Sequence, residues 1–310
     1  MIVIRTVFLV LLFLTLTVAP SDASRYAGEF LSEGVGARAL GMGRGFVAIS
    51  NDVSALYWNP SGLAHLNHGE AMMMHTERFG GVVNYDFAGV GLPLQDQMGI
   101  GIGLIRSGVD GIKYTVLENP MATVSSSNRP RVLKTVGNVD YAVFLSTGRV
   151  IRRRFDLGGS VKLIRRTIGD DRAFGYGIDI GVLYTPLRKI SFGAILRDAV
   201  STRIAWENGT KDLITPSALF GISYTSSLPY VSGDVSFAAG TETGEDRDRN
   251  LSVGMEYRYQ GQVAVRLGSE DRNLTAGGGF SLYNRVSVDV AFFDHPELDN
   301  TYRVSARVKF

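Results

Sequence analysis

The final stretch of the chain constrains its fold more than any other feature. Between residues 302 and 310, apolar and polar side chains alternate without a break. The apolar positions are Tyr302, Val304, Ala306, Val308 and Phe310, and the polar positions are Arg303, Ser305, Arg307 and Lys309. A period of two is that of a β-strand with one apolar and one polar face. Because terminal strands fray unless they are tied down, we expect this one to pair along its whole length.

The same alternation recurs from about residue 70 onwards. In 174–184, for example, the even positions hold aromatic or β-branched side chains, whereas 175, 177 and 181 are glycine and 179 is aspartate. The sequence predicts fourteen strands of this kind. They span residues 70–78, 82–92, 97–107, 138–148, 155–167, 172–185, 189–199, 216–227, 230–239, 250–259, 262–269, 272–283, 285–295 and 300–310.

These strands suit a transmembrane barrel better than a soluble sandwich. They are longer than the five or six residues usual in soluble sheets and match the roughly 9–11 residues that cross a bilayer at a tilt. Aromatic side chains gather near the strand ends, as an interfacial girdle requires. Examples are Phe155, Phe174, Tyr184, Phe192, Tyr257, Phe292 and Phe310.

The connections between the predicted strands alternate in character. Those after even-numbered strands are mostly tight, whereas 108–137, 200–215, 241–250 and 294–300 are long or strongly polar. Bacterial outer-membrane barrels have short periplasmic turns and longer outer loops. Because unpaired strand edges are not tolerated in lipid, the last strand is expected to pair with the first and close the barrel.

Charged side chains in the predicted strands share one face. Charges at membrane depth must face a wet or protein-filled interior, so this face is predicted to line the lumen. Its members are Lys162, Asp179, Arg197, Asp234, Glu256, Arg258, Arg266, Asp289, Arg303 and Arg307.

The first residues resemble an export signal. An apolar run from Thr6 to Ala19 follows Arg5, and Ser21 and Ala23 are suitably small for cleavage after residue 23. The run falls short of the roughly 20 residues of a spanning helix. The sequence therefore predicts a signal peptide at 1–23 and an exported protein without a transmembrane helix. Cysteine is absent, which excludes disulfides and a lipid-anchored form.

Residues 24–69 do not alternate and are rich in glycine, which predicts a plug folded into the lumen ahead of a barrel at 70–310. Ser50, Asn51 and Asp52 can cap a short helix through Tyr57. Asn59 precedes a proline, and we therefore expect it to be extended. The fold class that follows is all-β: a transmembrane antiparallel β-barrel of about 14 strands with a small N-terminal plug containing short helices.

The plug segment GARALGMGRGFVAISNDVSALYWNPSGLA resembles the N-terminal signature of the FadL/OmpP1-like outer-membrane proteins, particularly the PorV/PorQ branch. Ser61 departs mildly from the alanine usual after the Asn-Pro pair. The resemblance implies passive transport of long-chain fatty acids or other hydrophobic molecules. For the PorV branch it implies a surface role in type IX protein secretion, with secreted proteins as partners. The plug-motif residues it marks are Gly36, Arg38, Gly41, Gly43, Asp52, Asn59 and Pro60.

Two sets of residues are candidates for handling a hydrophobic ligand. Inward apolar residues in the outer half of the lumen are predicted to form a pocket, with packing against inward-folded outer loops as the alternative. They are Ile105, Ile195, Leu219 and Phe293. A change of apolar parity between Phe87 and Val90 suggests a bulge near Gly89. Together with the stripe of Gly99, Gly101 and Gly103 it suggests a lateral opening, or else small residues that make room for the plug.

Other readings of the sequence find little support. The Gly34–Ala39 match to a dinucleotide fingerprint lacks its βαβ context, and the four histidines have no metal-ligand spacing. No catalytic constellation, metal site or cofactor is predicted, and a net charge of +2 argues against nucleic-acid binding. The acidic stretch Glu242–Asp248 is expected to be a solvated outer loop, with cation-mediated contact to lipopolysaccharide as the alternative. The remaining partners are outer-membrane lipid and a hydrophobic small molecule. A purely structural barrel is the third function class.

Overall fold

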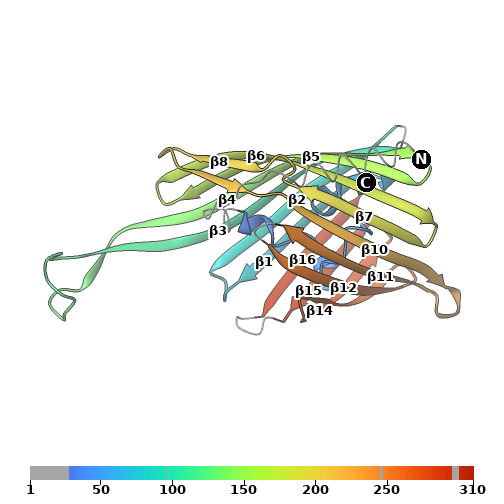
Figure 1. Cartoon of the computed structure of the whole chain (residues 1–310). Helices are drawn as coiled ribbons and strands as arrows, with labels where there is room; N and C mark the ends of the chain where they lie inside the picture. Colours follow the sequence, from blue (N-terminus) through green and yellow to red (C-terminus); the bar gives the residue numbers. More distant parts are fainter. Residues whose placement is uncertain (1–27, 96, 245–246, 295–299) are drawn as a thin grey trace.

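The computed structural model describes residues 28–95, 97–244, 247–294 and 300–310, so the predicted signal peptide lies outside the described residues. Its strands form one closed antiparallel barrel (Figure 1). All strands except β8 and β9 belong to the wall, which confirms the predicted fold class and fourteen strands. The wall strands are β1 (Glu70–Arg78), β2 (Val83–Leu94), β3 (Met98–Leu117), β4 (Pro130–Arg152), β5 (Phe155–Ile168), β6 (Asp171–Leu187), β7 (Ile190–Arg197), β10 (Ser217–Leu228), β11 (Gly233–Gly244), β12 (Arg247–Tyr259), β13 (Val263–Glu270), β14 (Asn273–Leu282), β15 (Val286–Phe293) and β16 (Thr301–Lys309).

The final strand closes the barrel as expected. β16 pairs with β15 on one side and with β1 on the other, from Glu70 opposite Lys309 to Glu77 opposite Tyr302. Beyond the strand, the Phe310 amide donates to the Gly69 carbonyl at 2.9 Å. The outward side chains of Tyr302 and Val304 are 65% and 49% exposed, whereas the inward Ser305 is 2% exposed. The apolar face is therefore outside and the polar face inside, which confirms the predicted orientation.

The two ends of the barrel differ. At one end, here called the turn end, short turns join β2 to β3, β4 to β5, β6 to β7, β12 to β13 and β14 to β15, and a 3₁₀ turn (η3, Pro229–Val231) joins β10 to β11. At the other end, here called the ribbon end, β3 and β4 extend far beyond the wall as a two-stranded ribbon (Figure 1). The β3–β4 ribbon is residues 109–117 paired with residues 130–138.

The predicted connections at 108–137 and 241–250 consist largely of strand, and between β3 and β4 only residues 118–129 lie outside the strands. Register shifts between Val109 and Ile112 and between Tyr114 and Thr115 interrupt the period of two, and this hides the ribbon strands from pattern reading. The ribbon extends away from the barrel and does not fold into the lumen (Figure 1). Within the second segment, β11 and β12 likewise continue to Gly244 and from Arg247.

A further hairpin occupies the predicted loop at 200–215. β8 (Thr202–Trp206) and β9 (Lys211–Ile214) pair with each other, and β8 pairs with β6 beyond the end of β7. The Asn208-Gly209 dipeptide between alternating residues is a strong hairpin signal, and it could have revealed this element.

The bulge predicted near Gly89 is absent from the described residues. β2 keeps an unbroken register with both β1 and β3. The parity of apolar residues changes because Tyr85 and Phe87 are buried inside the barrel, whereas Val90 and Leu92 face outward. Aromatic residues on the lumen face pack against the plug, so they need no kink in the strand.

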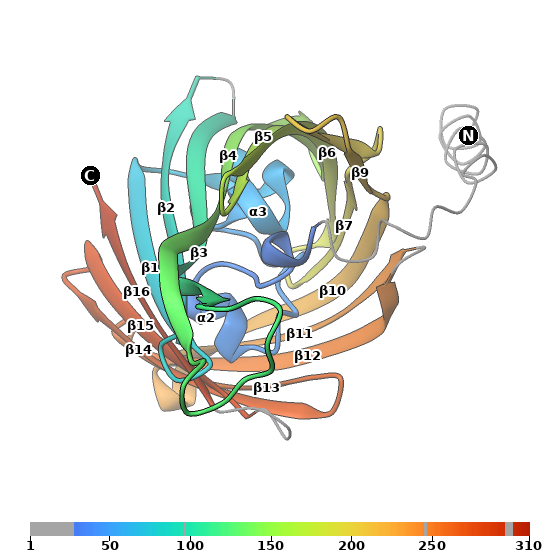
Figure 2. The same cartoon turned by 90° about the vertical axis from the view of Figure 1, so that its left-hand side faces the viewer.

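The lumen holds the segment from Gly28 to Gly69, here called the plug. Figure 2 looks into the barrel from the ribbon end and shows α2 and α3 enclosed by the ring of strands. The plug elements are η1 (Glu29–Leu31), α2 (Ala37–Gly41), α3 (Ala55–Trp58) and η2 (Pro60–His65). Trp58 lies at the centre of the buried core and donates its indole N–H to the Val35 carbonyl at 2.8 Å. Among the described residues, no helix is long and apolar enough to span a membrane.

Candidate functional site

The plug rests directly on wall backbone, because glycines face it on most strands. Gly99, Gly148, Gly158 and Gly181 are register partners across β3, β4, β5 and β6 and form a continuous row. Above this row lie residues 59–63 of the plug. Further glycines on β7, β10, β12 and β13 face plug residues 42–48. The whole set, here called the glycine belt, is Gly99, Gly148, Gly158, Gly181, Gly193, Gly221, Gly254 and Gly268.

Close approach explains why these positions are glycine. A Cβ atom added to Gly158 would lie 2.1 Å from the Ser61 amide nitrogen, and one added to Gly254 would lie 2.2 Å from the Met42 carbonyl oxygen. Real Cβ atoms do not approach other atoms this closely, so any side chain here displaces the plug. Of the belt, the sequence marks Gly99 alone, because the identity of a glycine does not show which part of the chain packs against it.

The glycines proposed for a lateral opening belong to this contact surface. A Cβ on Gly99 would lie 2.0 Å from the Leu63 carbonyl oxygen, and one on Gly101 would lie 2.8 Å from the Leu56 side chain. Gly89 and Gly103 are register partners and face Leu56 and Phe87. Strands β2 and β3 pair without a gap across the described residues here. The lateral opening therefore stays a prediction, with no opening present in this conformation.

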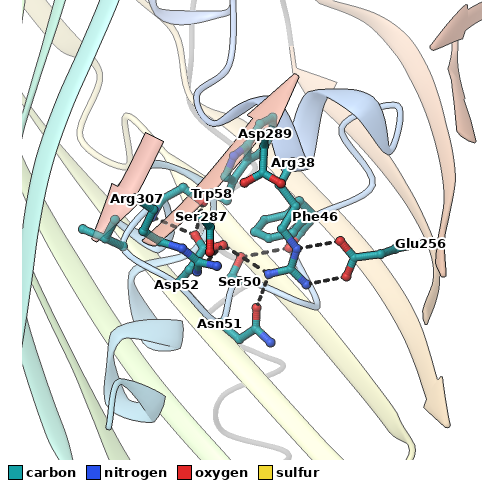
Figure 3. Close-up of polar contacts among 12 residues, drawn as sticks. Arg38, Phe46, Ser50, Asn51, Asp52, Trp58, Glu256, Ser287, Asp289 and Arg307 are labelled. Carbon is teal, nitrogen blue, oxygen red and sulfur yellow. Dashed lines mark hydrogen bonds and ion pairs between the residues drawn. The ribbon is translucent and has the colours of Figure 1, made fainter. Parts of the chain in front are cut away.

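Ion pairs hold the plug to the wall near the middle of the lumen (Figure 3). The guanidinium group of Arg38, on α2, forms a bidentate ion pair with the Glu256 carboxylate of β12. Its Nε donates to Oε2 at 3.0 Å and its Nη2 to Oε1 at 2.9 Å. Arg38 also pairs with Asp52, within the plug, at 3.2 Å. Such two-pronged contacts are among the stronger and more directional ion pairs in proteins.

A second ion pair joins plug and wall with the charges exchanged. Arg307 of β16 lies 3.3 Å from the Asp52 carboxylate, so the plug supplies the anion here and the cation at Glu256. Burial by itself would raise the pKa of Asp52, but Arg307 and Arg38 outweigh it and hold that pKa below its usual value. On the wall, Arg266 joins Glu256 at 2.6 Å and Asp289 at 2.8 Å. We call the group Arg38, Asp52, Glu256, Arg266, Asp289 and Arg307 the latch.

The glycines of the plug motif lie near the latch, where the backbone has positive φ angles or packs closely on the wall. Gly36 has a φ of +79° immediately before α2, and Gly43 has a φ of +59°. A Cβ on Gly43 would lie 2.6 Å from the carbonyl oxygens of both Val253 and Ser269. Gly41 packs on the backbone of Gly277, within contact distance.

The Asn-Pro pair of the motif joins the plug to the opposite wall. Asn59 is extended, as predicted, and its side-chain amide donates to the carbonyls of Val47 and Val182, both at 3.0 Å. The side-chain oxygen of Asn59 accepts a hydrogen bond from the Ser61 hydroxyl at 2.6 Å. Pro60 starts η2 above the belt glycine Gly148.

The structure does not bring the four predicted pocket residues together. Ile195 and Leu219 are register partners on β7 and β10 and cluster with Val47 of the plug. Ile105 is buried in the main plug core from β3, and Phe293 is partly buried beneath the Arg303 guanidinium. Parity correctly places all four on the inner face, but it does not fix their positions around the barrel.

One small cavity does involve a predicted residue. Leu219 lines it with Val47, Trp58, Arg44 and Glu270. Its volume is about 20 Å³, which is room for about one water molecule. Arg44 pairs with Glu270 at 2.8 Å and lies over the Trp58 ring. In this conformation the cavity is too small for a hydrophobic ligand.

The β8–β9 hairpin is anchored towards the ribbon end by a buried ion cluster. Lys162 lies 2.9 Å from Asp179 and 2.7 Å from Asp198. Thr202, at the start of β8, donates its hydroxyl proton to Asp198 at 2.5 Å. Ile204 and Ile214 of the hairpin join the same core as Phe30 of the plug, so the hairpin and the plug share one packed unit.

Comparisons with known proteins agree with this architecture. No family model matches the sequence, and no curated protein matches it. Among solved structures, the CymD monoaromatic hydrocarbon channel aligns with a TM-score of 0.64 at 12% identity, over 89% of this chain and 98% of that one. The Ralstonia pickettii toluene transporter TbuX gives 0.61 at 13%, over 90% and 99%. A Pseudomonas aeruginosa FadL homologue gives 0.56 at 12%, over 87% and 97%. The chain thus has the fold of these three proteins over nearly its whole length.

Proposed function

We propose that this protein is an outer-membrane channel for passive uptake of hydrophobic small molecules. The observation that carries the proposal is a closed barrel with an apolar outer face whose lumen holds a separate, latched plug. A plug joined to the wall by ion pairs and backbone contact can shift without opening the barrel itself. Two similar structures are described as a monoaromatic hydrocarbon channel and a toluene transporter, which supports a small hydrophobic cargo.

The proposal includes a placement in the membrane. Residues 1–23 act as a cleaved signal peptide, 24–69 form the plug and 70–310 form the barrel. The turn end faces the periplasm and the ribbon end faces outward, as short and long connections do in bacterial barrels. Outer-membrane lipid, including lipopolysaccharide, surrounds the apolar wall.

The closed lumen implies a gated path. A ligand is captured at the ribbon end and reaches the cavity beside Trp58, where Leu219 supplies an apolar wall and Arg44 a polar rim. Release then follows from movement of the plug towards the turn end or from separation of β2 and β3 along Gly99–Gly103. No cofactor or energy source takes part in such a path.

Uptake by whole cells tests the proposal. Cells with an intact outer membrane and no other hydrophobic channel are compared with and without the protein, using radiolabelled toluene and oleate. We expect faster entry of at least one of these probes, unaffected by dissipation of the proton gradient, and unchanged entry of a labelled disaccharide. Equal rates for both hydrophobic probes with and without the protein would contradict transport.

A surface role in protein secretion, as in the PorV branch, is the second candidate. The observation that favours it is the β3–β4 ribbon, whose Ile112, Tyr114 and Val116 are exposed on one face. An isolated two-stranded ribbon with free edges is a site where another chain can pair.

Shortening the ribbon separates the two candidates. Val109 and Asn138 are register partners, so residues 110–137 can be replaced by two glycines without disturbing the wall. We expect this variant to fold and to take up the hydrophobic probe at the full rate. Loss of surface-attached secreted proteins in this variant, with a wild type that takes up neither probe, would instead favour secretion.

A further inference from the structure

A large cavity lies at the turn end, beneath η2. It has a volume of about 790 Å³, within the range of ligand-binding pockets. The end of η2 forms its roof, and the turns β2–β3, β4–β5 and β6–β7 form its sides. We call it the turn-end vestibule. Its lining includes His65, Gln97, Arg153, Arg154 and Arg188.

Within the part of the chain that the structure describes, the vestibule has more arginines than carboxylates in its lining. Arg153 and Arg154 form the β4–β5 turn, and Arg188 lies in the neighbouring β6–β7 turn. The backbone holds these turns together, since the Thr185 amide donates to the Arg154 carbonyl at 2.9 Å. Asp156 is the one carboxylate among the described lining residues, and its Oδ2 lies 2.7 Å from Nε2 of His65. Among the described residues, no carboxylate pairs with any of the three arginines.

With the membrane placement proposed above, a row of aromatic side chains puts the arginines at the level of the lipid headgroups. Phe155 is the register partner of Tyr184, which is the partner of Phe192, so three exposed rings cross β5, β6 and β7 in a row. Such rings mark the edge of the hydrocarbon layer. The arginine turns follow immediately on the water side, and Leu187, exposed at their edge, continues the apolar surface up to them.

We propose that the turn-end vestibule binds the phosphate group of an anionic phospholipid from the adjacent leaflet. The planar guanidinium group matches phosphate oxygens with two parallel N–H donors, and basic pockets at a membrane edge attract anionic headgroups. The acyl chains then lie along the apolar wall beside Leu187. This inference rests on the membrane placement proposed above and is independent of transport.

Lipid binding to the purified full-length protein in detergent micelles tests the proposal. Radiolabelled phosphatidylglycerol and phosphatidylcholine are titrated against the wild type, R153Q/R154Q/R188Q and the milder R188Q. The control K113Q/R129Q/K211Q removes the same charge at the ribbon end. We expect the wild type and control to prefer phosphatidylglycerol, the triple vestibule variant to bind it about tenfold more weakly or worse, and R188Q to lie between.

Several results would overturn it. Equal binding of the two lipids by the wild type, or equal losses in both triple variants, would remove the vestibule as the site. Displacement of phosphatidylglycerol by an equal concentration of free glycerol phosphate would identify a site for soluble phosphate instead. The substituted turns are exposed, and unchanged heat-dependent gel migration confirms folding in each variant. Uptake of toluene or oleate is expected to persist when the lipid preference is lost, which separates this result from a failure of the channel.

Discussion

Replacing Glu256 with glutamine is expected to loosen the plug while the barrel stays closed. The buried carboxylate faces three guanidinium groups, on Arg38, Arg258 and Arg266, and glutamine leaves their charge uncompensated. Breaking a buried ion pair from one side costs about 3–5 kcal/mol. We expect plug unfolding to occur at clearly lower denaturant and bilayer currents to rise above the wild-type level.

Tryptophan fluorescence reads out this loss directly. The chain has two tryptophans, Trp58 in the plug core and Trp206 in β8, so a Trp206→Phe background leaves Trp58 as the reporter. Guanidinium titration then follows the environment of the plug. Asp234→Asn is the matched control, because Asp234 also has inward parity but is exposed at the turn end. The same transition midpoint in E256Q and D234N would show that the latch contributes nothing to plug stability.

Gly158→Val should displace the plug, whereas Gly159→Val on the same strand should not. A Cβ at 158 would lie 2.1 Å from the Ser61 amide nitrogen, but at 159 the nearest atom is the Asp179 carbonyl oxygen at 3.8 Å. Overpacking of this severity costs about 3 kcal/mol or more. Valine at 159 faces outward and gains up to about 1 kcal/mol from strand propensity.

The Trp58 reporter and bilayer current measure this pair as well. We expect G158V to shift the plug transition and raise the current, while G159V matches the wild type. If both variants behaved like the wild type, the plug would tolerate a side chain at position 158. Close contact with the glycine belt would then not be needed to hold the plug in position. Disruption of both would point to a general effect on β5.

The strands between residues 70 and 310 could be predicted because their two faces lie in different environments. Lipid selects apolar side chains on one face and the lumen selects polar ones on the other, as at Tyr302–Phe310, so the period of two appears directly in the sequence. Beyond the membrane this selection ends. The β3–β4 ribbon has bulges that reset its period, and β8–β9 is too short to show one.

The site was less accessible to sequence reasoning for a different reason. Parity gives the face of a residue but not its height or its position around the barrel, so Ile105 and Leu219 were grouped although they lie in different clusters. Glycine identity shows that a side chain is missing without showing what fills the space. The Arg38–Glu256 pair joins residues 218 positions apart, and no local pattern links them.

The plug contacts strands that come late in the sequence, and this constrains the order in which the parts of the protein can fold. Arg38 needs β12, the Ala37 amide donates to Ser305 of β16 at 3.1 Å, and Asp52 needs Arg307. The plug, near the start of the chain, therefore cannot complete its contacts until the last strand, β16, is in place. Until then Trp58 and its neighbours have no finished wall to pack against, so we expect the plug core to form only after β16 has closed the barrel.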